Sequence, residues 1–132
     1  MATTQKQQTG NFGESVACEH LENKGFRIIE RNRHISKNEI DIIAEDAKYI
    51  IFVEVKTRAE GGDYGSAGRA VDRPKRKGTV KAAQTYLATY YGGKQPRIDV
   101  IEVYLNGTAF SNPTVVKINH IENAFDARGR IR

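Results

Sequence analysis

The sequence has little cysteine and no tryptophan: Cys18 is the one cysteine among 132 residues. A lone cysteine excludes an internal disulfide framework and a zinc ribbon, and it fits a reducing, cytoplasmic setting. No apolar run approaches the roughly 20 residues that a membrane-spanning helix needs. Residues 1–10 are polar and lack the apolar segment of a signal peptide. These absences set aside secreted, membrane-spanning and disulfide-rich classes.

Acidic residues are fewer than basic ones, 16 against 21, which gives a formal net charge of +5. That excess is consistent with a polyanionic partner. The length is typical of one domain. We expect a disordered segment over residues 1–9, a single folded domain over 10–126 and a frayed basic tail over 127–132.

Hydrophobic periodicity predicts a helix and then three strands in the first half of the chain. The helix starts at Phe12 behind an Asn11 cap and stops before Gly25. Asn38 lies in the first turn between strands, where an asparagine can take a positive φ. The predicted strands cover residues 26–33, 39–45 and 49–57.

A glycine-rich stretch over residues 59–68 opens the second half and predicts a loop. Beyond it the patterns predict a helix over 71–91, strands over 97–105 and 115–118, a hairpin turn at Asn106-Gly107 and a helical turn over 119–125. The order α-βββ-α-β-β indicates an α/β fold with a mixed central sheet flanked by helices. The long connection through the second helix implies a parallel strand pair.

An acid and a lysine stand two residues apart in the most apolar strand. Alternation places Glu54 and Lys56 on one face, and charge inside such a strand is costly unless it is paired. Asp41 lies on the neighbouring strand, opposite Val53 or Glu54. Two carboxylates on adjacent strands can share one Mg²⁺ ion, which polarises a phosphodiester, while Lys56 orients water or stabilises charge on phosphorus. The alternative is that both acids pair with basic residues on a half-exposed sheet face.

Glu14 is the candidate for a third carboxylate, because it shares the apolar stripe of the first helix, on which Cys18 is a core residue. The alternative is a solvated first-turn acid that the helix dipole favours. The histidines lack the spacing of metal ligands and are expected at the surface: His20, His34 and His120.

A basic cluster with one acid, Asp72, surrounds the start of the second helix. Its six cations are Arg69, Arg73, Lys75, Arg76, Lys77 and Lys81. Cations near a helix N-terminus oppose the macrodipole, so phosphate capture explains them better than local stability does. Together with Arg58 they would hold a nucleic-acid backbone. The alternative is a solvated basic face.

Five segments together resemble the YraN-type family of bacterial proteins: residues 10–14 (GNFGE), 31–33 (RNR), 38–44 (NEIDIIA), 52–58 (FVEVKTR) and 97–100 (RIDV). The resemblance runs in the same order over about residues 10–126. That family is grouped with the PD-(D/E)xK nuclease superfamily and is similar to archaeal Holliday-junction resolvases. The resemblance implies a restriction-endonuclease-like fold and a Mg²⁺ site at Asp41, Glu54 and Lys56, with Glu14 as the helix carboxylate.

The leading hypothesis is a Mg²⁺-dependent endonuclease-like protein that acts on DNA, branched or damaged DNA included. Mn²⁺ is an acceptable substitute for the metal, and neither a small-molecule cofactor nor a membrane is involved. One rival is a nucleic-acid-binding module that keeps the fold without cutting. A third hypothesis is an assembly protein that dimerises through residues 49–52. Resolvase-like relatives dimerise, so a homodimer is expected by analogy.

Overall fold

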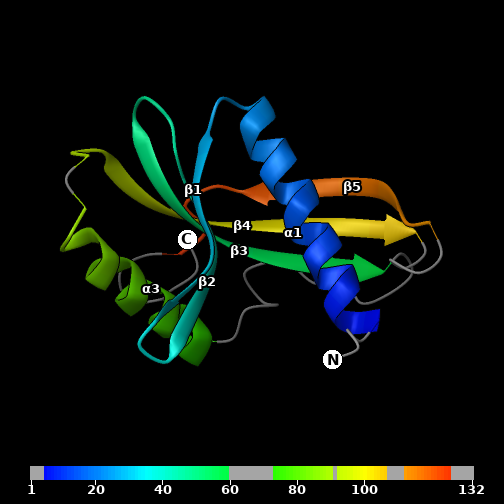
Figure 1. Ribbon diagram of the computed structural model, residues 1–132, viewed down its shortest axis with the longest axis horizontal. Helices are drawn as coiled ribbons and strands as arrows, with labels where there is room; N and C mark the ends of the chain where they lie inside the picture. The colour runs from blue at the N-terminus through cyan, green and yellow to red at the C-terminus, as the bar shows by residue number, and fades with distance from the viewer. Residues whose placement is uncertain (1–4, 60–72, 91, 107–111, 126–132) are drawn as a thin grey trace.

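The computed structural model describes residues 5–59, 73–90, 92–106 and 112–125. Its elements are α1 (Gln5–Asn23), β1 (Arg27–Ile35), β2 (Asn38–Glu45), β3 (Tyr49–Ala59), α3 (Arg73–Leu87), β4 (Gln95–Asn106) and β5 (Thr114–Ile121). This order matches the predicted α-βββ-α-β-β series, so the α/β fold class is confirmed (Figure 1).

One sheet of five strands runs through the molecule in the order β1-β2-β3-β4-β5. The pairs β1–β2, β2–β3 and β4–β5 are antiparallel. The pair β3–β4 is parallel, with Tyr49 opposite Gln95 at one end and Ala59 opposite Leu105 at the other. The predicted parallel pair across the second helix is therefore confirmed, and the mixed sheet is consistent with a restriction-endonuclease-like fold.

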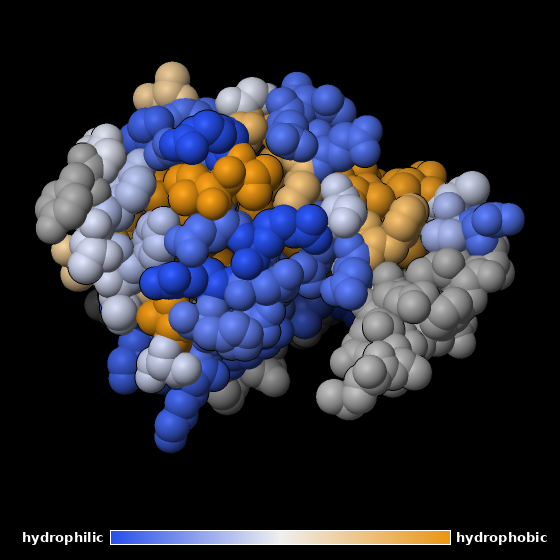
Figure 2. Space-filling view, in the orientation of Figure 1, coloured by the Kyte–Doolittle hydropathy of each residue, from blue (hydrophilic) through white to orange (hydrophobic). Residues whose placement is uncertain are grey.

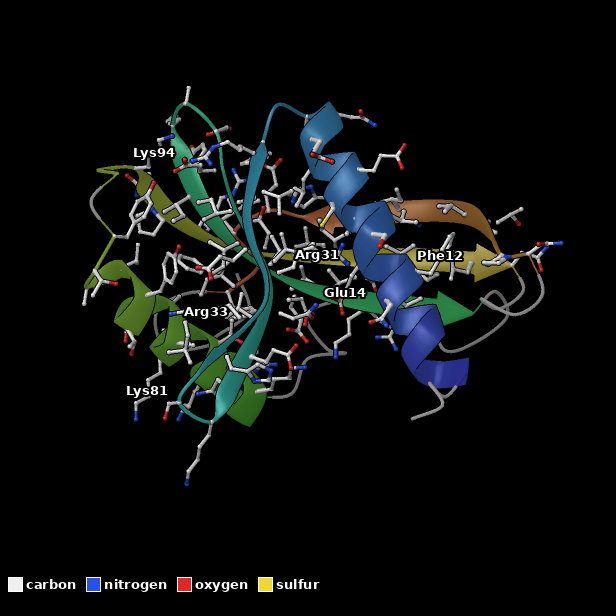
Figure 3. The ribbon with its side chains drawn as sticks, viewed as in Figure 1. Phe12, Glu14, Arg31, Arg33, Lys81 and Lys94 are labelled. Atoms are coloured by element: carbon white, nitrogen blue, oxygen red, sulfur yellow. The ribbon has the colours of Figure 1, made fainter. Side chains whose placement is uncertain are left out.

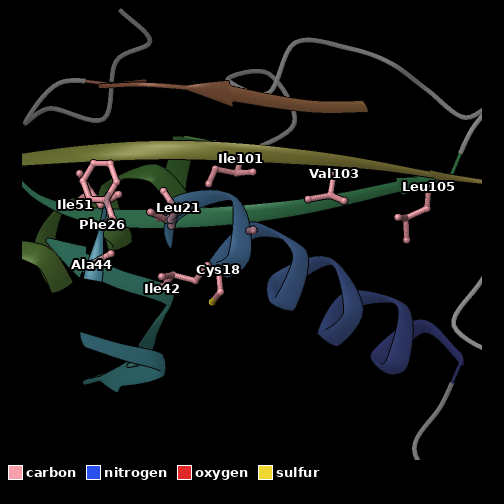
Figure 4. Packing of buried hydrophobic residues seen from close by; sticks show 11 residues of the cluster. Cys18, Leu21, Phe26, Ile42, Ala44, Ile51, Ile101, Val103 and Leu105 are labelled. Atoms are coloured by element: carbon pink, nitrogen blue, oxygen red, sulfur yellow. The ribbon is translucent and has the colours of Figure 1, made fainter. Parts of the chain in front are cut away.

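Two hydrophobic layers cover opposite faces of this sheet. On one face α1 lies across β3 and β4, and it packs Ala17 and Leu21 against strand residues such as Ile42 and Val53 (Figures 1 and 4). On the other face α3 places Ala82 and Ala83 against a second set: Ile40, Ile43, Ile50 and Phe52. Cys18 is buried in the α1 layer, as predicted. Hydrophilic residues cover much of the surface on the α1 side (Figure 2).

The first helix starts earlier than its sequence pattern indicates. It begins at Gln5, so Asn11 lies inside the helix and is not its cap. Residues 5–9 are helical, and the prediction of disorder is wrong for them; residues 1–4 lie outside the described residues. A polar helical turn that extends beyond the sheet has no apolar stripe, so periodicity misses it.

The end of α1 agrees with the sequence. Gly25 has φ +95°, the left-handed conformation predicted for it. The Phe26 N–H donates to the Leu21 carbonyl and the Gly25 N–H to the Glu22 carbonyl, both at 3.0 Å. These two bonds form the Schellman arrangement that ends many helices, and they turn the chain directly into β1.

Two local predictions are wrong. The left-handed residue of the β1–β2 turn is Ser36, with φ +57°, while Asn38 is already paired with Ile35 in the sheet. Residues 119–121 belong to β5 and not to a helical turn, because pairing with β4 continues to Ile121. In both cases cross-strand hydrogen bonds overrule the local preference.

Several predictions fall on residues that are not described. Residues 60–68 of the glycine-rich loop, Gly107 of the predicted hairpin turn, and the tail over 127–132 lie outside the described residues. Within the described part, the second helix runs from Arg73 to Leu87, shorter than the predicted 71–91. No helix among the described residues is both long and apolar enough to cross a membrane.

Candidate active site

Strands β2 and β3 separate at Asp41. Their backbone pairing runs from Glu45–Ile50 to Ile42–Val53 and goes no further toward Asp41. In place of a ladder bond, the Val55 N–H donates to Asp41 Oδ2 at 2.8 Å. The Asp41 carboxylate thus fills the gap between the two strands. Extending the register by one residue from the Ile42–Val53 pair places Asp41 opposite Glu54, one of the two positions that the sequence predicts.

Glu54 is buried on the sheet face that α3 covers, with 2% of its surface exposed. Its Oε1 atom forms ion pairs with Lys75 of α3 and with Lys56, whose Nζ lies 3.6 Å away. The predicted pair of Glu54 and Lys56 is therefore present, and a third charge from α3 joins it. The alternative that Glu54 pairs with basic residues is confirmed in its pairing, and only its half-exposed setting is wrong, because the Glu54 carboxylate is inside the protein.

Asp41 is held partly protonated near neutral pH. Burial raises its pKa most, the Glu54 charge adds to this, and Glu14 contributes further, while the Val55 N–H and Lys75 act in the opposite direction. The net result is a pKa of about 7 for Asp41. Carboxylates whose pKa is raised by burial and by other acids are characteristic of functional sites.

Glu14 lies in the middle of α1, two turns and more from its start at Gln5. The first-turn alternative for this residue is therefore wrong. Burial raises the pKa of Glu14; Arg31 and a side-chain hydrogen bond from Asn32 lower it, and the charges of Glu39 and Glu54 raise it. Its Oε1 atom is buried and has no hydrogen-bond partner in the described structure. Figure 3 shows Glu14 beside Arg31 where α1 meets β1.

Two glycines let the helices approach these acids closely. A Cβ atom at Gly13 would collide with the Thr57 side chain of β3, so α1 lies directly on the strand that carries Glu54. A Cβ atom at Gly78 would collide with Asn38 Oδ1 of β2 in the same way. The small residue on each helix therefore fixes how near Glu14 and Lys75 come to the sheet.

A polar pocket of about 300 Å³ opens between β2 and α3. It is lined by Lys37, Asn38, Glu39, Asp41, Lys75 and Thr79. Asp41 is thus reachable from outside through a pocket that also contains the Lys75 ammonium. A ligand that enters this pocket can therefore reach the Asp41 carboxylate and supply hydrogen-bond donors that the protein does not provide.

The described residues do not form a complete set of metal ligands. Among the described residues no three His, Cys, Asp or Glu side chains gather closely enough to hold one metal ion. Mg²⁺, however, usually takes one or two carboxylates and completes its shell with waters and substrate phosphates. Asp41 and Glu54 supply such a pair, and the unpartnered Oε1 of Glu14 lies in the same cluster of acids. The residues present therefore fit a hard dication.

The predicted phosphate-binding residues that the structure describes differ in their surroundings. Lys77 and Lys81 are exposed on α3, and Lys81 points outward (Figure 3). Lys75 is turned toward Glu54. Arg58 Nε lies 3.9 Å from Glu102 Oε2, a fully buried acid that sequence reasoning missed. Of the remaining residues, Arg76 is half-buried, Arg73 is the first residue of α3, and Arg69 lies outside the described residues.

A second buried acid, Asp99 of β4, was also missed from the sequence. It accepts hydrogen bonds from Arg97 Nε and Nη2, both at 2.9 Å, from the Asn123 N–H at 2.9 Å and from His120 Nε2 at 2.8 Å. His120 Nδ1 lies 3.1 Å from His20 Nε2. The surface prediction is therefore wrong for His20 and His120, while His34 is exposed. The signal was available: Asp99 sits inside an apolar strand, as Glu54 does.

The proposed dimer segment over residues 49–52 is not a surface. Ile50, Ile51 and Phe52 have no exposed area, because β3 is the central strand with a helix layer on each face. The prediction that an assembly protein dimerises there is wrong.

The order of the elements and the mixed five-stranded sheet define this chain as an α/β protein, consistent with a restriction-endonuclease-like fold, in which the charge of Glu54 on β3 acts on Asp41 of β2. The family model of the uncharacterised protein family UPF0102 matches residues 13–103. The chain belongs to this family, which is the membership that its YraN-type motifs predict.

Relatives from several bacteria are similar over nearly the whole chain. A UPF0102 protein of Caldanaerobacter subterraneus subsp. tengcongensis is 43% identical over 126 residues, which cover 95% of this chain and 100% of the relative. One from Clostridium botulinum is 43% identical over 118 residues, 88% of this chain and 92% of the relative. One from Persephonella marina is 42% identical over 118 residues, 89% and 92%.

Proposed function

We propose that this protein is a Mg²⁺-dependent endonuclease of the PD-(D/E)xK type, which hydrolyses phosphodiester bonds in DNA. The observation that carries the proposal is a carboxylate beside a polar pocket: Asp41 lines the pocket, burial raises its pKa to about 7, and the charges of Glu54 and Glu14 from two other elements add to that rise. The repulsion among these acids costs free energy, and a bound dication would remove that cost.

Asp41 and Glu54 would hold the metal, and Glu14 would contribute its free oxygen to the outer shell. When bound, Mg²⁺ supplies Lewis-acid polarisation of the scissile phosphate and of water. Lys75 and the dication would compete for Glu54, because Lys75 pairs with the same carboxylate. Metal binding would therefore release the Lys75 ammonium for a substrate phosphate.

Lys56 is the residue that would act on the reacting atoms. Its ammonium is held by Glu54 at 3.6 Å and is about one quarter exposed, with 24% of its side chain accessible. In that position it can donate a hydrogen bond to an attacking water or to oxygen on phosphorus as negative charge develops. Lys77 and Lys81 on the exposed side of α3, with Arg69, Arg73 and Arg76, would hold the DNA backbone.

The test is cleavage of a labelled panel of single-stranded, duplex, flap and four-way-junction DNA with Mg²⁺ or Mn²⁺. Asp41→Asn, Glu54→Gln and Lys56→Met should each reduce the cleavage rate at least about 100-fold. Glu19→Gln is the matched control. Glu19 is exposed on α1, and it lies five residues after Glu14, which places it on a different side of the helix. Cleavage that is the same in Asp41→Asn as in the wild type would disprove the proposed site.

One observation favours a second candidate, a nucleic-acid-binding protein that does not cut. The Lys75 ammonium already lies against Glu54, so the protein supplies its own cation to the acid. In that case DNA binding would depend steeply on salt, and neither Mg²⁺ nor Asp41→Asn would alter it. Lys77→Ala and Lys81→Ala would each lower the salt slope by about one, whereas Lys48→Ala, at the exposed β2–β3 turn, would leave it unchanged.

A further inference from the structure

The sheet face on which α3 packs becomes polar toward the C-terminal ends of β3 and β4. Val100 of β4 still packs against Val80 of α3. Beyond it, alternate residues of β3, β4 and β5 share this face and form two rows across the strands. The first row is Lys56, Glu102 and Asn119, and the second is Arg58, Tyr104 and Lys117. We call these six residues the polar strip. Figure 1 shows α3 at the opposite end of the sheet from the arrowheads of β3 and β4.

Glu102 is the acid of the polar strip, and it is fully buried. Its Oε1 atom accepts a hydrogen bond from Asn119 Nδ2 at 2.9 Å. Its Oε2 atom lies 3.9 Å from Arg58 Nε, which is too long for a hydrogen bond, and neither atom has a hydrogen-bond partner among the described residues. Glu102 therefore attracts Arg58 by its charge without taking up the Nε–H in a hydrogen bond.

Lys117 is the exposed end of the polar strip. Its Nζ lies 5.6 Å from the centre of the Tyr104 ring, a cation–π contact that keeps the ammonium over this face of the sheet. Arg58 and Lys117 lie in one row with Tyr104 between them, so their backbones are two strand spacings apart, about 10 Å. A DNA strand rises by about the same distance over three nucleotides.

We propose that the polar strip binds the phosphate backbone of the substrate DNA. Arg58 and Lys117 contact the phosphates, and Glu102 is a positioning residue that holds Arg58 in place. This inference rests on the proposed function, in which Lys56 of the same strip acts on the reacting atoms. The strip has three cations and one acid whose carboxylate is buried, so the charge that it presents to a ligand is positive.

The place of Glu102 explains why an acid serves inside a basic strip. Lys56 and Arg58 lie two residues apart on the same face of β3, where like charges repel. Glu102 is paired with Lys56 across the β3–β4 ladder, so its charge reduces that repulsion. Both cations can then stay on the face, and each is partly exposed, with 24% of the Lys56 side chain and 27% of the Arg58 side chain accessible.

Fluorescence anisotropy with labelled duplex and four-way-junction DNA in EDTA measures binding without cleavage over a range of salt concentrations. Arg58→Ala and Lys117→Ala should each reduce the slope of log affinity against log salt by about one, because each removes a phosphate contact. Lys48→Ala is the matched control and should leave the slope unchanged. Lys48 is also exposed, but it precedes β3 and lies at the opposite end of that strand from Arg58. Unchanged slopes in both Arg58→Ala and Lys117→Ala, or no DNA binding by the wild type at low salt, would overturn the inference.

Glu102→Gln tests the positioning role. Loss of a negative charge alone strengthens DNA binding, whereas loss of the group that holds Arg58 weakens it. We expect weaker binding and a salt slope close to that of Arg58→Ala. In the double variant of Glu102→Gln and Arg58→Ala the two losses should not add, because both act through one side chain. Stronger binding by Glu102→Gln, or additive losses, would overturn the role of Glu102. Urea denaturation checks that Glu102→Gln is folded, and Lys117→Ala, at an exposed residue, tests the strip if it is not.

The polar strip and the nuclease fail separately. A wild type that cleaves no DNA, with reduced salt slopes in Arg58→Ala and Lys117→Ala, removes the nuclease and keeps the strip as a DNA-binding surface. A wild type that cleaves DNA, with unchanged slopes in both variants, keeps the nuclease and removes the strip.

Discussion

Asp99 and Asp41 are two acids of the sheet whose pKa values the surrounding protein shifts in opposite directions. Asp99 is fully buried, and burial alone would raise its pKa; hydrogen bonds from His120, Arg97 and the Asn123 N–H outweigh burial and lower it. Asp41 receives one backbone N–H and lies near two further carboxylates, so its pKa is raised. Asp99 has donors from the protein for both of its oxygens, whereas Asp41 has one backbone donor and two acids that raise its pKa.

This contrast teaches how to separate structural from functional buried charge. A carboxylate with donors for its oxygens stabilises the fold around it, as Asp99 joins β4 to β5 and to the chain at Asn123. A carboxylate that lacks them costs free energy, and that cost is retained where a ligand is to bind. The difference between the two acids predicts effects that decrease in size from the acids themselves to the residues around them.

Replacing each acid by its amide should give opposite results. Asp99→Asn removes the buried counter-ion of Arg97 and leaves it the exposed Glu122 carboxylate, so we expect a loss of about 3–5 kcal/mol in the free energy of unfolding. Asp41→Asn removes a repelling charge and should be neutral or stabilising by up to about 4 kcal/mol. Urea denaturation at pH 7 measures both. A loss of the same size in the two variants would contradict the comparison.

The pH dependence of stability should separate the two acids as well. The folded pKa of Asp41 is raised, so its contribution is fully present below its unfolded pKa and is lost as pH rises toward about 7. That loss is at most about 4 kcal/mol. The folded pKa of Asp99 is lowered, so its contribution is present above its unfolded pKa and is lost at more acidic pH.

The measurement is the urea midpoint of the wild type and of Asp41→Asn between pH 4 and 8. The variant should lack the decline in stability that the wild type shows between pH 4 and 7. Identical profiles for the two proteins would mean that Asp41 titrates normally.

Gly13→Ala should weaken the acid cluster without changing any charge. The new methyl group would collide with Thr57 and push α1 away from β3, which costs about 1–3 kcal/mol. Glu14 would move away from Asp41, and the pKa of Asp41 should fall. Thermal unfolding and a carboxyl titration test this, and Gly10→Ala is the control, because a Cβ atom at Gly10 meets nothing.

The smallest effect is expected at His20, beside the satisfied acid. Burial lowers its pKa most, and the His120 and Lys24 charges add to this. Its contribution to stability is therefore present above its unfolded pKa and is lost as pH falls through the lower folded value. His20→Gln should flatten this loss, by less than about 1 kcal/mol. His34→Gln, at an exposed histidine, should not, and thermal melts between pH 5 and 7 distinguish the two.

Local patterns predicted most of the fold. The strands that carry Asp41 and Glu54 were predicted correctly, because alternation and turn residues are properties of neighbouring positions. The helix end at Gly25 was predicted for the same reason. The early start of α1 at Gln5 and the left-handed Ser36 were missed. Both depend on the backbone of the folded chain and leave no periodic pattern.

The acids of the site and Lys56 were predictable from the sequence, and the contact of Lys75 was not. Asp41, Glu54 and Glu14 stand out because each is an acid among apolar residues. Lys75 was assigned to DNA binding, yet it is turned toward Glu54, and only the packing of α3 on β2 decides that. The pairing of Arg58 with Glu102 likewise comes from a contact between distant segments, for which one sequence gives no signal.

The hydrogen bond that ends the β2–β3 ladder also makes one backbone amide an internal indicator. Val55 N–H is bonded to a side chain that can lose or gain a proton, whereas ladder amides such as those between Ile42 and Val53 are bonded to carbonyls that cannot. Its nitrogen chemical shift and its rate of hydrogen exchange should therefore follow the charge on Asp41. A single resonance would then show when the carboxylate becomes charged and when a cation arrives, with no label attached to the protein.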